Sequence, residues 1–277
     1  MGSLREIKEH IGSVKSTLKI TSAMKLVASS KLRKVQKAIE TMLPYRKALE
    51  DILSKLPASS ALSAEGSGRT VIVAIASNSS LCGSFNVNAV KAALGEASKY
   101  DDVEVLAIGR KMSDAMKKAG FSQPADYSSL VAKPFYEDAG ELAQNLMDGF
   151  EAGEYSRVLL VYNHFESTYR QVPIVEQFLP IISKHSEEEA EQALEEYIFE
   201  PEAAEITGTL MPQVQRLKIY TAILDSSAAE YAARTVAMQT ASENAEDLLS
   251  ELTLEYNKGR QQKITAEILD LVGGMAQ

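Results

Sequence analysis

The sequence has the composition of an ordinary folded protein but an uneven distribution of charge. Its 277 residues carry a formal net charge of −9, with 45% hydrophobic and 24% charged residues, which excludes a disordered, collagen-like or mucin-like chain. Residues 1–56 contain nine lysines and three arginines against four glutamates and one aspartate, a net charge of +7, so the remainder carries −16. The single cysteine, Cys82, excludes an intrachain disulfide framework and a multi-cysteine zinc site and fits a reducing compartment. No apolar stretch approaches the roughly 18 residues of a transmembrane helix, and the start of the chain shows no signal or transit pattern.

The amino-terminal segment follows a heptad pattern. Apolar or small residues recur at spacings that alternate three and four: Leu4, Ile7, Ile11, Val14, Leu18, Thr21, Ala28, Leu32, Val35, Ile39 and Met42. This pattern predicts one coiled-coil helix over roughly residues 3–56, with Pro44 as the place where it would bend. Lys25 is the one clear departure, because it occupies a seam position where a two-stranded coiled coil takes an apolar residue.

The carboxyl-terminal segment repeats the pattern. Its seam runs from Tyr231 to Tyr256, and a second long helix is predicted from about 211 to 273. With a compact region between the two helices, an antiparallel coiled coil of the chain's two ends is the simplest arrangement. An apolar stripe follows at the end of the chain and needs shielding by this protein or by a partner: Ile264, Ile268, Leu271, Val272 and Met275.

The middle of the chain alternates strands with helices. Strands are predicted at 70–76, 103–109, 157–165 and 170–180, and helices at 85–100, 110–120 and 136–153. This order predicts a Rossmann-like α/β domain with a mostly parallel sheet, right-handed crossovers and an antiparallel hairpin at one edge. The chain is thus predicted to comprise an amino-terminal helix (1–58), a central α/β domain (69–185), an acidic connector (186–208) and a carboxyl-terminal helix (209–277).

No catalytic or cofactor constellation emerges from the residue spacing. The loop SNSSLCGSFN after the first strand contains only Gly83, so neither a dinucleotide fingerprint nor a P-loop can be written through it. An ordinary turn is favoured there, with Cys82 as a buried small residue rather than a nucleophile. His10, His164 and His185 are scattered. The acidic run 187–205 suggests a solvated linker or connecting helix, although its YIFEP segment could anchor the chain or contact another protein.

Five segments, in order along the chain, resemble the gamma subunits of F-type ATP synthases. They are REIKEHIGSVKSTLKITSAMKLVASSKLRK, SNSSLCGSFNVN, YIFEP, AARTVAMQTASENAEDLL and NKGRQQKITAEILDLVGGMAQ. The final segment is similar to the family's signature at Ile264, Thr265, Glu267, Asp270 and Gly274. It departs from that signature at Met275, where the family usually has Ala, and the sequence stops at Gln277.

The resemblance implies a rotor shaft rather than an enzyme. The paired terminal helices would stand inside a hexamer of alternating alpha and beta subunits, and the rest would join the epsilon subunit and the membrane ring of c subunits. Proton flow through the ring would thereby be coupled to ATP synthesis or hydrolysis in the beta subunits. No cofactor, metal, nucleic acid or small-molecule substrate is implied. The expected location is peripheral, on the cytoplasmic face of the bacterial plasma (inner) membrane.

The resemblance also implies roles for particular residues. Met24 and Lys25 match the family's coupling region, and Lys25 would face the hexamer or polar groups of the other helix, unless it only extends its amine to solvent. Residues implied to meet the beta subunits or to support Met24 are Arg234, Arg260, Gln261, Thr265 and Glu267. Tyr197 and Glu200 would form the foot on the c ring.

Two other classes of protein fit parts of the sequence. One is a basic coiled-coil scaffold that binds nucleic acid or a membrane surface through residues 5–47. The basic residues are spread around that helix, however, and the acidic remainder would oppose a polyanion. The other is an α/β oxidoreductase with helical arms, which the absent glycine fingerprint disfavours.

Overall fold

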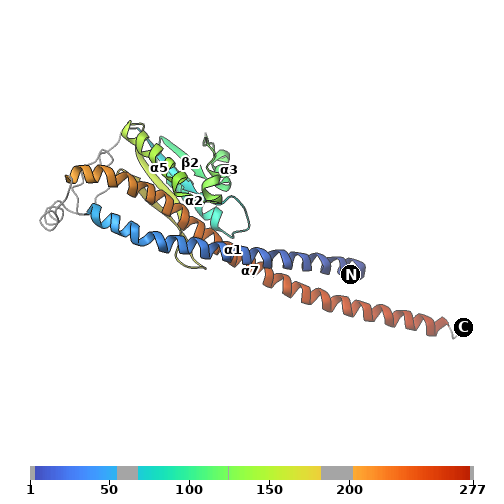
Figure 1. Cartoon of the computed structure of the whole chain (residues 1–277). Coiled ribbons are helices and arrows are strands. Elements are labelled where there is room, and N and C mark those ends of the chain that lie inside the picture. Colours follow the sequence, from blue (N-terminus) through green and yellow to red (C-terminus); the bar gives the residue numbers. More distant parts are fainter. Residues whose placement is uncertain (1–3, 55–67, 124, 182–201, 275–277) are drawn as a thin grey trace. The chain divides into compact units, whose positions relative to one another are not determined.

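A computed structural model describes residues 4–54, 68–123, 125–181 and 202–274 (Figure 1). The chain divides into two compact units. The coiled-coil unit comprises Met1–Ser29 and Arg234–Gln277, and the sheet unit comprises Ser30–Ala233. Each long helix, α1 (Leu4–Ser54) and α7 (Ala203–Gly274), contributes to both units. The predicted domain boundaries near residues 58 and 186 lie outside the described residues and stay predictions.

The predicted amino-terminal helix is confirmed, but the predicted start of the carboxyl-terminal helix is wrong. Helix α7 begins at Ala203 rather than near residue 211, so the end of the predicted acidic connector is helical. Pro212 lies inside the helix, where it removes one backbone hydrogen bond. Burial of Met211 and Val214 on either side of it favours continuing the helix through the proline.

The sheet unit contains the predicted mostly parallel sheet. Its strands are β1 (Arg69–Ile75), β2 (Val103–Ile108), β3 (Tyr155–Phe165) and β4 (Gln171–Leu179). They lie in the order β2-β1-β3-β4, with β1 parallel to both β2 and β3 and with β4 antiparallel to β3 at the edge. Continuous β-branched and leucine-rich runs form β1 and β3 because both faces of these central strands are covered.

Helices cover both faces of this sheet. The helices α2 (Phe85–Ala97) and α3 (Arg110–Lys118) share a core with one face. The helices α4 (Ser128–Ala132) and α5 (Tyr136–Glu151), together with α7, share a core with the other. The three predicted helices of the middle region are confirmed. Helix α4 was not predicted, because five residues are too few to display a helical period.

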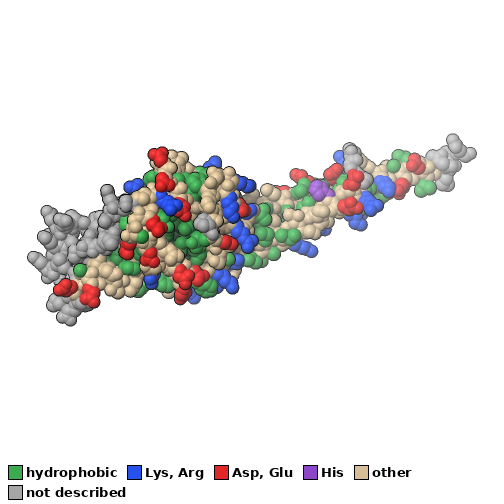
Figure 2. Space-filling model, turned by 90° about the horizontal axis from the view of Figure 1, so that it is seen from above, with side chains coloured by type: hydrophobic (Ala, Val, Ile, Leu, Met, Phe, Trp, Pro, Cys, Tyr) green, Lys and Arg blue, Asp and Glu red, His purple; other side chains and the backbone are tan. Residues whose placement is uncertain are grey.

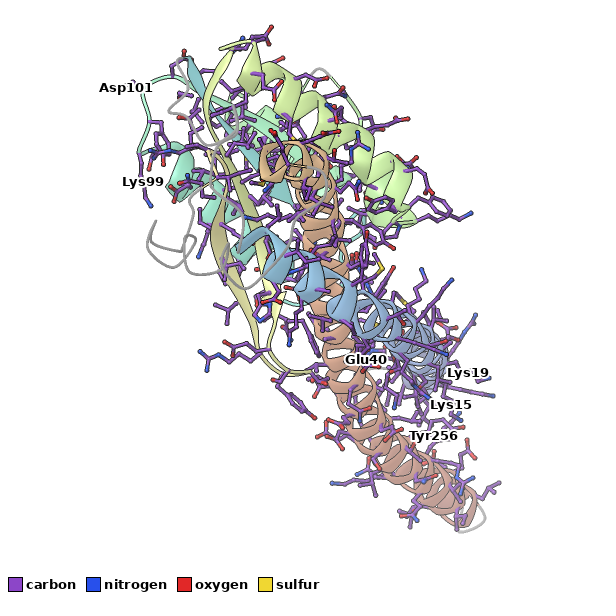
Figure 3. All side chains as sticks on the ribbon, turned by 60° about the vertical axis from the view of Figure 1, so that its left-hand side comes forward. Lys15, Lys19, Glu40, Lys99, Asp101 and Tyr256 are labelled. Atoms are coloured by element: carbon purple, nitrogen blue, oxygen red, sulfur yellow. The ribbon has the colours of Figure 1, made fainter. Side chains whose placement is uncertain are left out.

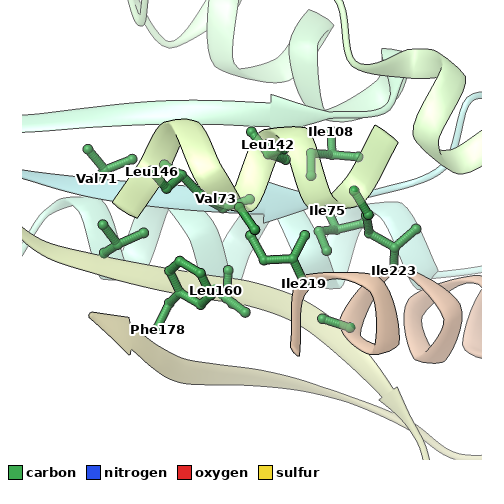
Figure 4. Packing of buried hydrophobic residues seen from close by; sticks show 14 of the residues in the cluster. Val71, Val73, Ile75, Ile108, Leu142, Leu146, Leu160, Phe178, Ile219 and Ile223 are labelled. Carbon is green, nitrogen blue, oxygen red and sulfur yellow. The ribbon is translucent and has the colours of Figure 1, made fainter. Parts of the chain in front are cut away.

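Helix α7 is part of the core of the sheet unit. Figure 4 shows Ile219 and Ile223 of α7 beside Val73 and Ile75 of β1 and Leu142 of α5. All five side chains are almost completely buried, and fully burying one such side chain stabilises a fold by about 1.5–3 kcal/mol. Helix α7 therefore belongs to the hydrophobic core of the sheet unit and, further along the chain, forms one of the two helices of the coiled-coil unit.

The coiled-coil unit is antiparallel, as predicted. Leu4 of α1 packs against Gly259 of α7, whereas Thr21 contacts Ser242 and Lys25 contacts Gln239. Because the residue number falls on α7 as it rises on α1, the two helices run in opposite directions. Between these contacts lie the buried or partly buried seam residues Ile7, Ile11, Val14, Leu18, Ala245, Leu249, Leu252 and Tyr256. None of the described helices reaches the length and hydropathy needed to cross a membrane.

Candidate functional site

The centre of the candidate site is a polar layer in the seam of the coiled-coil unit. Lys25 is half-buried, and its Nζ donates a hydrogen bond to Oε1 of Gln239 at 2.8 Å. Gln239 in turn donates through Nε2 to Glu243, one helical turn along α7. One layer away, the Ser242 hydroxyl donates to Thr21 Oγ1 at 2.8 Å. Lys25 therefore faces a polar group of the other helix, which supports that interpretation over an amine directed at solvent.

This polar layer interrupts an otherwise apolar seam. Leu18 precedes it and the buried Ala28 follows it on α1. A polar group at a seam position lowers the stability of a coiled coil but selects one register, since a slipped pairing leaves the group without its partner. The layer thus specifies that Lys25 sits opposite Gln239.

Beside the polar layer, α1 exposes apolar side chains. Ile20 is 60% exposed, Val27 is 57% exposed and Met24 between them is half-buried. Their spacings of four and three residues place all three on one face of the helix. Together they form the Met24 face, an apolar surface next to a satisfied cation. Such a surface is typical of a helix that another protein covers.

The other predicted site residues fall into two groups along α7. Arg234 is buried and lies five residues before Gln239. Arg260, Gln261, Thr265 and Glu267 are exposed. Arg260 lies 21 residues beyond Gln239, which is about 30 Å along the helix axis. The structure therefore does not bring the second group next to Met24.

The exposed group makes only local contacts among those described. The Thr265 hydroxyl donates to the backbone oxygen of Gln261 at 2.9 Å, one turn earlier in the same helix. Lys263 and Glu267 form an exposed ion pair at 3.8 Å. Exposed pairs of this kind contribute little to stability. These side chains are thus free to be recognised by a partner without loss of internal structure.

The apolar stripe at the end of α7 is not covered by α1 within the described residues. Ile264, Ile268 and Leu271 are between 47% and 70% exposed. Leu4, the first described residue of α1, packs against Gly259, so α7 extends beyond it. The described part of the chain thus leaves the stripe largely exposed, and its shielding by a partner stays a prediction. The side chain of Val272 and residue Met275 lie outside the part that is described.

The predicted foot cannot be placed. Tyr197 and Glu200, with the YIFEP segment and most of the acidic run, lie outside the described residues. The role of these two residues stays a prediction.

The loop after β1 is an ordered turn, as predicted. The backbone N–H and the hydroxyl of Ser77 both donate to Oδ1 of Asn86, at 3.0 and 2.9 Å. Nδ2 of Asn86 is 3.1 Å from the sulfur of Cys82, which is buried. Asn78 donates to the backbone oxygen of Ser128 and accepts from the N–H of Arg110, which ties the loop to α4 and α3. These side chains bind one another rather than presenting their polar groups to a ligand.

The position where such a sheet usually binds a ligand is filled by α7. In doubly wound sheets, ligands bind outside the carboxyl ends of the strands at the point where the strand order reverses, here between β1 and β3. Ala229 and Ala233 of α7 pack there against Cys82 and Phe85, with Phe165 of β3 beside them. The crevice therefore holds a helix of the same chain, which argues against the oxidoreductase alternative.

The small residues of α7 form two adjacent stripes, whereas the heptad pattern predicts only one seam on this helix. Ala228 and Ala232 pack against Leu32 of α1, whereas Ala229 and Ala233 pack against the loop after β1. The signal available in the sequence was the presence of alanine pairs at two neighbouring helical positions, because packing against one other helix needs only one stripe of small residues.

We expect Ala229→Leu to lower the free energy of unfolding by about 1–3 kcal/mol, because the added side chain has no room at this close contact. Urea denaturation of the full chain measures the change. The matched control is Ala266→Leu, at an exposed position of the same helix. We expect this control to change the free energy of unfolding by less than about 0.5 kcal/mol. Equal effects at both positions would contradict the assignment of this contact.

The basic residues of the coiled-coil unit do not form one stripe on the face shown in Figure 2, where they are interleaved with acidic and apolar side chains. Lys15 and Lys19 are exposed on α1 (Figure 3), and Arg5 is paired with Glu9 at 3.1 Å. A nucleic-acid surface needs a continuous positive potential. This arrangement argues against the nucleic-acid alternative.

Comparisons with known proteins agree with this architecture. The family described as ATP synthase matches residues 3–277. The ATP synthase gamma chain of Bacteroides fragilis is 47% identical over 99% of both chains, and that of Bacteroides thetaiotaomicron is 45% identical over the full length of both. The gamma chain of Flavobacterium johnsoniae is 40% identical, over 99% of this chain and 98% of its own.

Solved structures share the fold. A chain in the rotor of Euglena gracilis mitochondrial ATP synthase matches with a TM-score of 0.66 at 20% identity, covering 95% of this chain and 99% of its own. A chain from the central stalk and c-ring structure of Tetrahymena thermophila mitochondrial ATP synthase matches with a TM-score of 0.56 at 23% identity, covering 80% and 99%. With curated relatives similar over their whole length, the chain belongs to the ATP synthase gamma chain family.

Proposed function

We propose that this chain is the central shaft of a proton-translocating ATP synthase and couples proton flow to ATP synthesis or hydrolysis. The observation that carries the proposal is an antiparallel pair of terminal helices, both of which leave apolar side chains exposed. The chain that contains this pair is similar to gamma chains over its full length. An isolated coiled coil buries its apolar residues in the seam, so exposed ones need a surrounding protein.

The surrounding protein is proposed to be the hexamer of alpha and beta subunits. The Met24 face and the apolar stripe at Ile264, Ile268 and Leu271 would contact it, with Lys25, Arg234, Arg260, Gln261, Thr265 and Glu267 among the contacting or supporting residues. The structural relatives come from a rotor, from an assembly of OSCP, F1 and c-ring, and from a central stalk with its c-ring. By analogy, we infer that the epsilon subunit and the c ring are further partners, with Tyr197 and Glu200 at the c ring.

The mechanism follows from the asymmetry of the shaft. A pair of helices has no three-fold symmetry, so at each angle it presents different side chains to each of three surrounding catalytic subunits. Each angle then favours a different conformation at each nucleotide site, which is a population shift driven by position. One proton crossing about 100 mV supplies about 2.3 kcal/mol, so several crossings must be accumulated and transmitted through this chain for each ATP.

The chain itself is proposed to be non-catalytic. The crevice of its α/β fold is filled by Ala229 and Ala233, which supports this assignment. We place the chemistry in the beta subunits. Since the curated relatives are bacterial proteins, we propose a peripheral position on the cytoplasmic face of the inner membrane, held through the partner subunits.

Reconstitution tests the proposal. When the chain is co-expressed with alpha and beta subunits from its own source, we expect a stoichiometric complex whose ATPase activity depends on this chain. Addition of the epsilon subunit and the membrane sector should yield ATP-driven proton pumping in vesicles. Recovery of the chain only with nucleic acid, or cofactor-dependent turnover by the isolated chain, would overturn the proposal.

A further inference from the structure

Asp225 of α7 holds the end of strand β3 through two contacts. Its Oδ1 accepts a hydrogen bond from the backbone N–H of Phe165 at 3.0 Å, and its Oδ2 lies 2.6 Å from Nδ1 of His164. The short contact requires a hydrogen on Nδ1, which both the corresponding neutral tautomer and the imidazolium supply. One carboxylate, itself largely buried, thus binds two consecutive residues of the strand.

The N–H of Phe165 is available to α7 because β3 is longer than β1. The described parallel ladder ends where Ala74 of β1 pairs with Val161 of β3, whereas β3 continues to Phe165 beside β4. A backbone N–H in this extension has no β1 residue to donate to, and such groups need an acceptor when they are shielded from water. Asp225 provides that acceptor, so α7 continues the hydrogen bonding of the sheet beyond the end of β1.

Lys218 makes a second attachment from α7 to the same hairpin. Its Nζ donates to the backbone oxygen of Gln177 at 2.6 Å and lies 3.1 Å from Oε1 of Glu176, both on β4. Tyr162 of β3 donates to the other oxygen of Glu176 at 3.2 Å, and burial raises the pKa of Tyr162, so its hydroxyl keeps its proton. The second attachment therefore engages both strands of the hairpin.

The two attachments lie on one face of α7. Lys218 and Asp225 are seven residues apart, which is about two helical turns and about 10 Å along the axis. The apolar packing of Ile219 and Ile223 between them is not directional. Hydrogen bonds and ion pairs, in contrast, depend on angle and distance. Two such bonds at separate points resist both sliding of the helix and its rotation about its own axis.

We propose that Lys218 and Asp225 form a latch that makes the β3–β4 hairpin turn rigidly with α7, so that torque passes between the shaft and the α/β domain. This inference rests on the proposed rotor function. It assigns the two residues as positioning residues for torque transfer, with no contact to nucleotide or to the catalytic subunits. Without the latch, the apolar contact would remain but would yield under load.

Angular fluctuations of a stalled single complex test the latch. The assembled complex is held with its catalytic subunits fixed to a surface, and a bead is attached to the α/β domain through cysteine introduced at the exposed Lys133, since Cys82 is buried. We expect the angular variance of the bead to increase at least about twofold for Asp225→Ala. Asp225→Asn retains an acceptor for Phe165 and should give an intermediate variance, and Lys218→Met should add to the effect.

The controls separate torque transfer from general stability. Asp114→Ala removes an exposed carboxylate from α3, on the sheet face opposite α7, and should leave the variance unchanged. Unloaded ATPase activity should also stay the same in the latch variants. If the original chain rotates but the Asp225 and Lys218 variants fluctuate no more than it does, the latch is refuted. If the original chain forms no rotating complex, the rotor function itself fails, and the two outcomes are therefore distinct.

Discussion

Replacing Met24 by lysine is expected to leave the complex assembled but to lower the number of protons pumped per ATP hydrolysed. The existing cation next to it, Lys25, is held by Gln239 of the other helix at 2.8 Å. A new amine at position 24 would instead extend from the Met24 face, between the exposed Ile20 and Val27. If the proposed hexamer surrounds this face, the amine would be placed to bind acidic groups of the hexamer rather than of this chain.

The size of the effect follows from the strength of the new ion pair. An added attraction of about 1.4 kcal/mol at one rotational position would lower the rate at which the shaft leaves that position about tenfold. Rotation would then stall more often under load, and hydrolysis would proceed with less pumping. Parallel assays of ATP hydrolysis and of proton uptake in inverted membrane vesicles measure the ratio directly.

A matched substitution tests whether charge is the cause. Met24→Leu conserves volume and apolar character, so we expect pumping per ATP close to that of the original chain. Met24→Arg should behave like the lysine variant. Unchanged pumping per ATP in the two cationic variants, or an equal loss with leucine, would reject the proposed role of the Met24 face.

Removing the apolar stripe at the end of α7 is expected to weaken assembly much more than folding. Ile264, Ile268 and Leu271 are exposed in the isolated chain, and exposed positions usually change the free energy of unfolding by less than about 0.5 kcal/mol. Each side chain that a partner buries fully contributes about 1.5–3 kcal/mol to association. Simultaneous replacement of the three by serine should therefore lower the yield of the complex with alpha and beta subunits severalfold or more, as should truncation from Ile264.

The control for this experiment lies on the other side of the same helix segment. Serine at Gln262 and Ala266 changes exposed residues outside the stripe and should leave the yield unchanged. Thermal unfolding of the isolated chain should be similar for all variants. Normal yield and activity after removal of the stripe would show that this surface is dispensable.

The candidate site was only partly predictable. Lys25 stood out in the sequence because it interrupts the heptad pattern, and this pattern can be read from the amino-terminal helix alone. Its partner Gln239 lies 214 residues away. Which residue lies opposite Lys25 depends on the register between the two helices, and two apolar seams can pair in several registers. The apolar stripe with Ile264 and Ile268 was likewise visible in the sequence, with shielding by this protein or by a partner left open, but only the packing of Leu4 against Gly259 shows where α1 stops covering α7.

The sequence by itself determined the strands, the longer helices and their order, because helical and strand periods reflect which faces of each element are buried. It did not show the five-residue helix α4 or the start of α7 at Ala203. It also predicted the rotor family through five ordered segments, and a charge of +7 on residues 1–56 indicated a distinct amino-terminal region. The tertiary structure alone decided how those faces are shared. It divided the alanines of α7 between α1 and the loop after β1, placed Asp225 at the end of β3, and brought Gln239 opposite Lys25. These contacts join residues far apart in the chain, and such pairing is set by shape and register in three dimensions rather than by any local preference.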